Sequence, residues 1–354
     1  MDFALDEACV AAVQTASAVL DAEAMLDASG TDAADRTWKA LGGSGLLCLS
    51  VPRRLGGEGL GVLASMVVLT EIGRRAVALP ALPSLALGVL PLVRWATPDQ
   101  QDALLPGTPV LTAGLREAAD PEPTVPATRC TPDLAITGTK VGVAYADRAR
   151  AILVPVRQAT GQAAVAIVDP SAAGVTLTRT PSSGDTPEWT VVFDGAVASG
   201  LLGGGAAAVE DLYRLALAGA CALGDGAVAG ALALTSAHVR SRQQFGRRLA
   251  EFQAVAQQIA DVWIASRTLH LATLSACWRL DRASDPRTDL DVAGYWLARE
   301  APLAVRTCHH LHGGLGLDVT YPLHRYTSLV KDLVRAVGGA RFRLDALGRR
   351  DDLH

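Results

Sequence analysis

The sequence has little lysine and lacks the usual marks of a nucleic-acid or metal site. Only three of its 32 basic residues are lysine, namely Lys39, Lys140 and Lys331, and the formal net charge is -4. Because no basic block is present, we expect no nucleic-acid partner. The six cysteines form no C-x-x-C pair and no Cys/His spacing that suits zinc, so we expect no metal and a reducing compartment.

Signal-peptide and membrane-span patterns are lacking too. The N-terminal residues MDFALDEACVAAVQ are acidic where a signal peptide needs positive charge. The one long apolar stretch, from Leu215 to Ser236, contains Asp225 and four glycines, which makes it a poor membrane span. A helix packed between other helices explains this stretch better. We predict a cytoplasmic protein without a membrane partner.

What the chain does contain is 50% hydrophobic residues, arranged in three regions of different periodicity. Residues 1–110 have helical spacing interrupted by glycine and proline, which predicts an all-α domain. Residues 111–203 carry short β-branched runs between turn residues, which indicates an antiparallel sandwich or barrel. Residues 204–354 return to helical patterns, and apolar residues from Phe245 to Val262 step by three or four as on one long helix. The order excludes an alternating Rossmann or TIM pattern and predicts an α+β fold ending in a helical bundle.

Two C-terminal segments carry the strongest motifs. The first reads Arg240-Ser-Arg-Gln-Gln-Phe-Gly246 and continues with Phe252-Gln-Ala-Val255, which by spacing alone is a helix–glycine–helix junction with solvated arginines. The second reads His309-His-Leu-His-Gly-Gly-Leu-Gly316. Its adjacent histidines fall on different helix faces, so a metal site is not expected. The Gly313–Gly314 pair permits close approach of another group to the backbone.

Together these segments resemble the acyl-CoA dehydrogenase family. The runs RxRxQFG…FQAV…AD and HLHGGLG…YPLHRY are similar to the family's C-terminal bundle in residue type, order and separation. Residues Gly45 to Leu60 resemble its N-terminal junction, and Ile136-Thr-Gly-Thr-Lys140 resembles a turn of its middle β-domain. The resemblance implies a helical domain, a β-barrel and a four-helix bundle. It also implies an FAD enzyme that makes a trans-2-enoyl-CoA, with a base for the α-proton and flavin N5 as hydride acceptor.

The resemblance further implies an FAD shared across a subunit interface. One subunit cradles the flavin ring and supplies the base, while its neighbour holds the pyrophosphate and adenosine end. A guanidinium is a planar donor suited to phosphate oxygens. The residues that match the second role are Arg242 for the pyrophosphate, Gln244, Phe245, Gln253, the Gly313–Gly314 pair, and His310 where the family usually has glutamine.

By the same comparison, the positions that would cradle the flavin ring and supply the base depart from the family pattern. Residues 116–121, Arg-Glu-Ala-Ala-Asp-Pro, lack the Gly-Ser of the family's loop, and the two flavin-packing positions hold Gly142 and Ala144. The two positions of the usual carboxylate base hold Ala216 and Val337, and neither side chain can accept a proton. The catalytic residue is therefore not identified.

Three other groups near these segments remain candidates for a relocated base. They are Tyr145, Glu210 and Asp211, and an ordinary turn or surface role is the alternative for each.

This chain keeps the residues for the pyrophosphate end and lacks those for the flavin ring and the base. Such a pattern resembles the heteromeric α2β2 members of the family, in which a full-length subunit pairs with a shorter, degenerate one. The HLHGGLGLDVTYPLHRY stretch is similar to the smaller subunits of actinobacterial enzymes that shorten steroid side chains. We therefore predict half of a heteromeric FAD enzyme, with an acyl-CoA substrate, a larger acyl-CoA dehydrogenase subunit and an electron-acceptor flavoprotein as partners. A self-sufficient homomeric dehydrogenase with a relocated base and a flavin-free acyl-CoA-binding scaffold are the alternatives.

Overall fold

The computed structural model describes residues 4–25, 31–282 and 284–351. The chain forms two compact units, each built from separate stretches of sequence. One unit comprises Met1–Leu5, Met66–Val77 and Ala220–His354, and we call it the bundle unit. The other comprises Asp6–Ser65 and Ala78–Gly219, and we call it the sheet unit. Two helices, α3 (Val62–Arg74) and α6 (Ala206–Ser241), contribute residues to both.

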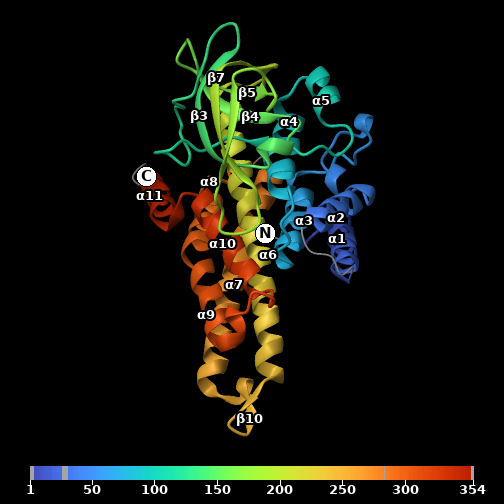
Figure 1. The fold of residues 1–354 in the computed structure, drawn as a ribbon, viewed down its shortest axis with the longest axis vertical. Helices are drawn as coiled ribbons and strands as arrows, with labels where there is room; N and C mark the ends of the chain where they lie inside the picture. Colours follow the sequence, from blue (N-terminus) through green and yellow to red (C-terminus); the bar gives the residue numbers. More distant parts are fainter. Residues whose placement is uncertain (1–3, 26–30, 283, 352–354) are drawn as a thin grey trace. The chain divides into compact units, whose positions relative to one another are not determined.

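The sheet unit contains short helices and a curled eight-stranded sheet (Figure 1). Its helical segments are α1 (Glu7–Met25), α2 (Thr31–Gly43), η1 (Leu46–Cys48), η2 (Arg53–Leu55), η3 (Leu82–Val89), α4 (Leu90–Trp95), α5 (Pro98–Leu104) and η4 (Ala146–Arg148). Its strands are β1 (Thr112–Ala113), β2 (Arg129–Cys130), β3 (Ala135–Ala144), β4 (Ile152–Gln158), β5 (Ala163–Val168), β6 (Val175–Thr180), β7 (Glu188–Val197) and β8 (Gly200–Leu201).

The strands follow the order β6-β7-β3-β2-β4-β5-β8, and β1 pairs with β4. Most neighbours are antiparallel, as the short β-branched runs predict, whereas β1 and β2 each run parallel to β4. The core under the sheet is filled by fully buried side chains such as Ile136, Val154, Val191 and Phe193. Two register shifts interrupt β3, one of them between Lys140 and Val143. This second bulge falls in the segment that the family resemblance assigns to the flavin cradle.

The bundle unit packs four helices along the C-terminal part of α6 (Figure 1). They are α7 (Gln253–Asp281), α8 (Arg287–Arg299), α9 (Ala301–His312) and α10 (Leu323–Ala336), and α11 (Gly339–Asp351) packs on α8 and α10. The connections include the two-residue strands β9 (Gln243–Gln244) and β10 (Arg247–Arg248) and the 3-10 turns η5 (Leu249–Glu251) and η6 (Gly313–Leu317). The α+β prediction, with helices at both ends and strands in the middle, is confirmed.

Helix α6 is long and apolar enough to cross a membrane, yet 83% of its most apolar window is buried inside the protein. Small residues let other backbones approach it. A side chain at Gly226 would place Cβ 1.9 Å from the Thr70 carbonyl oxygen of α3. This close contact explains the glycine-rich composition of the stretch and confirms that it is a core helix.

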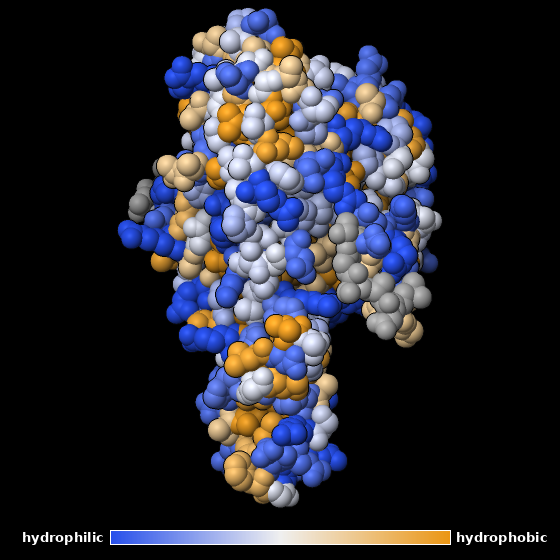
Figure 2. Space-filling model, in the orientation of Figure 1, coloured by the Kyte–Doolittle hydropathy of each residue, from blue (hydrophilic) through white to orange (hydrophobic). Residues whose placement is uncertain are grey.

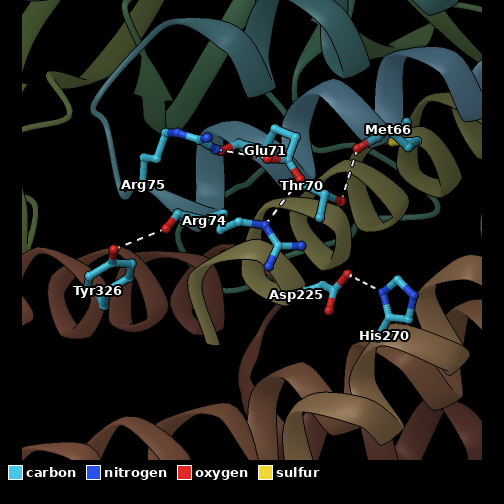
Figure 3. A network of polar contacts seen from close by, with 8 residues as sticks. All are labelled: Met66, Thr70, Glu71, Arg74, Arg75, Asp225, His270 and Tyr326. Atoms are coloured by element: carbon cyan, nitrogen blue, oxygen red, sulfur yellow. Dashed lines mark hydrogen bonds and ion pairs between the residues drawn. The ribbon is translucent and has the colours of Figure 1, made fainter. Parts of the chain in front are cut away.

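Polar contacts surround the crossing of α3 and α6 in the bundle unit (Figure 3). The Tyr326 hydroxyl donates a 3.0 Å hydrogen bond to the Arg74 carbonyl, and the Asp225 carboxylate lies 2.9 Å from His270 Nδ1. Glu71 pairs with Arg74 at the end of α3 and with Arg75 directly after it. These groups have partners of their own, so they act in holding the bundle together.

One prediction about the bundle is wrong. The residues from Phe245 to Val262 are not one helix, because α6 ends at Ser241 and α7 begins only at Gln253. Between them the chain makes a hairpin in which Phe245 and Gly246 both have positive φ, 53° and 80°. Two consecutive left-handed residues form a tight hairpin turn and cannot continue a helix. The apolar spacing could not separate these two cases, because apolar residues three or four apart fit a helical pattern whether or not a turn interrupts them.

Candidate functional site

The turn after α6 presents a cluster of polar and aromatic side chains to solvent. The Arg242 N–H donates a 2.8 Å hydrogen bond to the His238 carbonyl, which continues the helix by one last bond. The Arg242 carbonyl then accepts from Leu249 N–H at 2.9 Å, which closes the β9–β10 hairpin. All side chains from Arg242 to Arg248 are exposed. This backbone frame therefore holds Arg242, Gln244 and Phe245 outward on one small hairpin.

The chemistry of this hairpin suits an anion attached to a planar ring. Arg240, Arg242, Arg247 and Arg248 supply four exposed guanidinium groups. Within the described part of the chain no carboxylate pairs with the Arg242 guanidinium. Such a group can offer a bidentate hydrogen bond to phosphate.

Two aromatic rings accompany these cations. The Phe245 side chain is 91% exposed, and its ring meets Phe252 edge-on with centroids 6.4 Å apart. The Arg247 guanidinium carbon lies 3.9 Å from the Phe252 ring centroid. An exposed aromatic face beside a cation offers a stacking surface for a planar ligand.

The second segment ends α9 with an open backbone. Gly313 has φ 58° and ψ -134°, and its N–H donates to the carbonyls of His309 and His310. A Cβ added at Gly313 or at Gly314 would meet no atom within 4 Å. The backbone of this turn is thus accessible to a ligand, while the positive φ of Gly313 explains why a side chain is disfavoured there.

The structure brings these two segments together inside the bundle unit. The imidazole rings of His238, on α6, and His312, on α9, stack with centroids 4.4 Å apart and planes 20° apart. His238 lies one helical turn before Arg242, and His312 directly precedes Gly313. The Arg242 hairpin and the Gly313–Gly314 turn therefore share one anchoring contact.

The other predicted residues are not part of the stacked pair. Gln253 is exposed at the first position of α7, and His310 is exposed on the last turn of α9. The stacked pair itself was missed by sequence reasoning. The available signal was a histidine one turn before Arg242 and another next to the di-glycine. From the sequence, His312 is considered only as a possible metal ligand. The described residues contain no cluster of three metal-ligating side chains.

In the sheet unit, Lys140 is fully buried and forms an ion pair with Glu117, at 2.8 Å between Nζ and Oε1. Glu117 also accepts hydrogen bonds from the N–H groups of Ala127 and Thr128 and from the Thr128 hydroxyl. Burial alone would raise the Glu117 pKa, but these hydrogen bonds and that from Lys140 lower it to about 2. Burial lowers the pKa of Lys140 against the opposing pull of Glu117. The pair ties the loop after β1 to β3.

The two flavin-packing positions offer neither an aromatic ring nor a hydroxyl. Gly142 lies in the bulge of β3 with φ 65°, and Ala144 is the last residue of that strand, whose carbonyl accepts from the Thr112 hydroxyl at 2.7 Å. Next to them Tyr145 is buried, and this burial raises its pKa. The two positions that the family resemblance assigns to flavin packing therefore lack the side chains that the family uses there, whereas exposed donors suited to a phosphate are present at the Arg242 hairpin.

Neither position of the usual base carries a proton acceptor. Ala216 lies half-buried in α6, within the sheet unit. Val337 follows α10 in the bundle unit and is buried, with its carbonyl bonded to Arg343 Nε at 2.6 Å.

The two carboxylates that could have replaced a base already have partners. Asp211 accepts from Arg94 at 2.6 Å and from Trp95 Nε1 at 2.7 Å, and its side chain is buried. Glu210 pairs with Arg214 one turn along α6. Asp211 is therefore held in the sheet unit by two donors, and Glu210 forms an exposed ion pair along its own helix.

Comparison with known proteins identifies the family. The family models "Acyl-CoA dehydrogenase, N-terminal domain" and "Acyl-CoA dehydrogenase, C-terminal domain" match residues 7–109 and 204–340. The chain is similar to "Acyl-CoA dehydrogenase FadE28" of Mycobacterium tuberculosis, with 46% identity covering 90% of this chain and 93% of that protein.

Two solved structures are similar along the whole chain. One is a variant of the "Tcur3481-Tcur3483 steroid ACAD", with TM-score 0.90, 30% identity and 96% of each chain covered. The other is the "ChsE4-ChsE5 complex from Mycobacterium tuberculosis", with TM-score 0.89, 30% identity, and 99% of this chain and 98% of that chain covered. These findings confirm the resemblance drawn from the motifs. The chain belongs to the acyl-CoA dehydrogenase family.

Proposed function

We propose that this chain is the smaller, catalytically incomplete subunit of a heteromeric, FAD-dependent acyl-CoA dehydrogenase. One observation carries the proposal. The Arg242 guanidinium and the Gly313–Gly314 backbone are accessible to a phosphate, while Ala216 and Val337 stand at the two positions that the family resemblance assigns to the base. A chain of this kind can hold one end of a cofactor but cannot remove an α-proton.

The residues that would hold FAD belong to its pyrophosphate and adenosine end. They are Arg242, Gln244, Phe245, Gln253 and His310, with the Gly313–Gly314 turn offering backbone access. The chemistry that FAD supplies when bound is acceptance of a hydride from the substrate β-carbon. This chain's own residues bind and orient the phosphate end across the interface, and they move no proton on the substrate.

The partner is a larger acyl-CoA dehydrogenase subunit that supplies the carboxylate base and the flavin cradle. Support comes from the two similar solved structures, whose names join two components. The word "steroid" in one of those names supports a CoA thioester of a steroid side chain as the substrate. An electron-acceptor flavoprotein would reoxidise the cofactor, and the complex would work in the cytoplasm.

The test is co-expression of the chain with a larger dehydrogenase subunit encoded beside it. We expect one stable complex that contains FAD and oxidises an acyl-CoA with a dye acceptor. Replacing the base of the partner should abolish turnover and leave FAD in place. A complex that remains active without that base would contradict the division of labour.

A further inference from the structure

The stacked histidines join two turns that are distant in sequence. His238 bonds through its carbonyl to the N–H of Arg242, and His312 is the last helical residue before Gly313. Their rings are 4.4 Å apart and nearly parallel. Any movement that separates the rings would also separate the Arg242 hairpin from the Gly313–Gly314 turn.

Hydrogen bonds determine which nitrogen of His312 carries the proton. Nδ1 lies 2.8 Å from the Cys308 carbonyl oxygen, which can only accept, so Nδ1 is the donor. Nε2 lies 3.0 Å from the Tyr321 hydroxyl, which can then donate to it. The neutral ring with its proton on Nδ1 has both nitrogens satisfied. A second proton on Nε2 would reverse this bond, so that His312 donates to the Tyr321 hydroxyl, and it would place a positive charge against His238 in the stack.

We propose that His238, His312 and Tyr321 are positioning residues, which hold the Arg242 and Gly313–Gly314 turns in register for the pyrophosphate of FAD only while both imidazoles are uncharged. This inference rests on the proposed function, since it concerns the same cofactor end. Neither histidine needs to touch FAD for this role.

The charges around the stack oppose its protonation. Arg242 acts on His238 from the end of α6, and His309 acts on His312 from α9. Lys331 and His324, on α10, act in turn on His309. Basic groups on α6 and α9 thus act on the stack directly, those on α10 act only through His309, and Tyr321 faces the stack from the loop between η6 and α10.

The direction of the pH dependence follows from these surroundings. Burial holds the pKa of both His238 and His312 below the ordinary 6.5, helped at His238 by His312 and Arg242 and opposed at His312 by the hydrogen bond to the Cys308 carbonyl. A histidine whose folded pKa is depressed stabilises the fold fully above its ordinary pKa, and this contribution is lost as the pH falls below it. Because protonation of the stack should compete with FAD binding, we expect FAD to be held well at neutral pH and released once the pH falls through these lowered pKa values.

The test measures the FAD dissociation constant of the complex between about pH 5.5 and pH 8. Three variants separate packing from charge. His238→Phe keeps a stacked ring but removes one titrating group, His312→Phe removes both hydrogen bonds of the buried ring, and Tyr321→Phe removes only the hydroxyl. Below the lowered histidine pKa values, competition with one bound proton should cost the wild-type complex up to about tenfold in FAD affinity per pH unit.

We expect His238→Phe to keep its FAD affinity at pH 8 and to reduce the loss on acidification to about threefold or less. His312→Phe and Tyr321→Phe should weaken FAD binding by about fivefold to tenfold at pH 8, as removal of a buried hydrogen bond does. Labelling the histidines with ¹⁵N should show His312 protonated on Nδ1 at pH 8. Protonation on Nε2 instead would overturn the proposal.

Arg242→Ala distinguishes failure of this inference from failure of the proposed function. If Arg242→Ala loosens FAD while the three variants match wild type in affinity and pH profile, the positioning role is overturned and the cofactor role stands. If Arg242→Ala leaves FAD affinity unchanged, the chain does not hold the pyrophosphate, and both proposals fall.

Discussion

The Arg343 guanidinium donates a 2.6 Å hydrogen bond from Nε to the carbonyl oxygen of Val337. Both residues are buried, and Asp291 lies 3.8 Å from the same guanidinium. The loop at one position of the usual base is therefore tied into the bundle by its backbone, with an apolar side chain packed inward.

Restoring a carboxylate at this loop should not restore activity. Val337→Glu places a charge in a buried apolar site, and we expect it to lower the free energy of unfolding by about 3 kcal/mol or more. Ala216→Glu, at the half-buried alternative position, should fold more readily and remain equally inactive in the isolated chain. Thermal unfolding and a dye-reduction assay measure both effects. Acyl-CoA turnover by either variant alone would show that only the base was missing.

Arg242 should contribute directly to FAD affinity in the complex. A charged hydrogen bond to phosphate is typically worth about 1.5–3 kcal/mol, which corresponds to about tenfold to 150-fold in affinity. Arg242→Ala should lose this amount without disassembling the complex, and Arg242→Lys should recover only part of it because an ammonium lacks the planar fork.

A matched control for this variant is Arg299→Ala, an exposed arginine at the end of α8. It should change FAD affinity by less than about threefold. Titration of FAD into the apo complexes compares the variants. Equal losses from both substitutions would point to net charge and away from a specific site.

The sequence was sufficient for the fold class and for the family, for different reasons. The change from helical to strand periodicity and back reports which faces are buried, and burial is what organises the units. Arg242, Phe245 and Gly313 stand in motifs whose order and separation are particular to one family. Their shared location could not be derived, because nothing in the spacing says that His238 stacks on His312.

The hypothesis of a relocated base could also be judged only from the distances between Asp211 and its partners. Asp211 is an unpaired acid in sequence terms, yet Arg94 and Trp95 occupy both of its oxygens. The partners are far apart along the chain, so no local pattern could reveal them. The prediction of one helix from Phe245 to Val262 is wrong for the opposite reason. A local apolar pattern exists there, but it matches a helix as well as a hairpin.

The Lys140–Glu117 pair should be a pH-sensitive element of the sheet unit. Glu117→Gln leaves a buried ammonium without its carboxylate, and we expect a loss of about 3 kcal/mol in stability at neutral pH. Since the Glu117 pKa is lowered to about 2 from 4.5, its contribution is full above the ordinary value and is lost as the pH falls toward 2. Thermal unfolding of both proteins from neutral to acidic pH should show the difference shrinking. A constant difference would contradict this role.

The isolated chain should associate with itself or aggregate. Apolar side chains are exposed in the bundle unit, with Leu317 82%, Val319 81% and Trp263 58% exposed. Figure 2 shows apolar atoms at the surface of the bundle end that carries β10. Obligate interfaces of this class commonly bury more than about 2,000 Å².

Co-expression with the larger subunit should suppress this association, and Trp263→Ser should reduce it in the isolated chain. Light scattering over a range of concentrations measures both. A monodisperse monomer of the isolated chain would contradict the expectation that a partner covers these apolar side chains of the bundle unit.

The central claim is that this chain is half of a cofactor site, and flavin content tests it most directly. The chain is purified alone and together with its larger partner, and the absorbance of bound flavin per polypeptide is recorded for each. We predict little FAD and no acyl-CoA oxidation for the chain alone, and stoichiometric flavin with turnover for the complex. A yellow homomeric preparation that oxidises an acyl-CoA by itself would contradict the account.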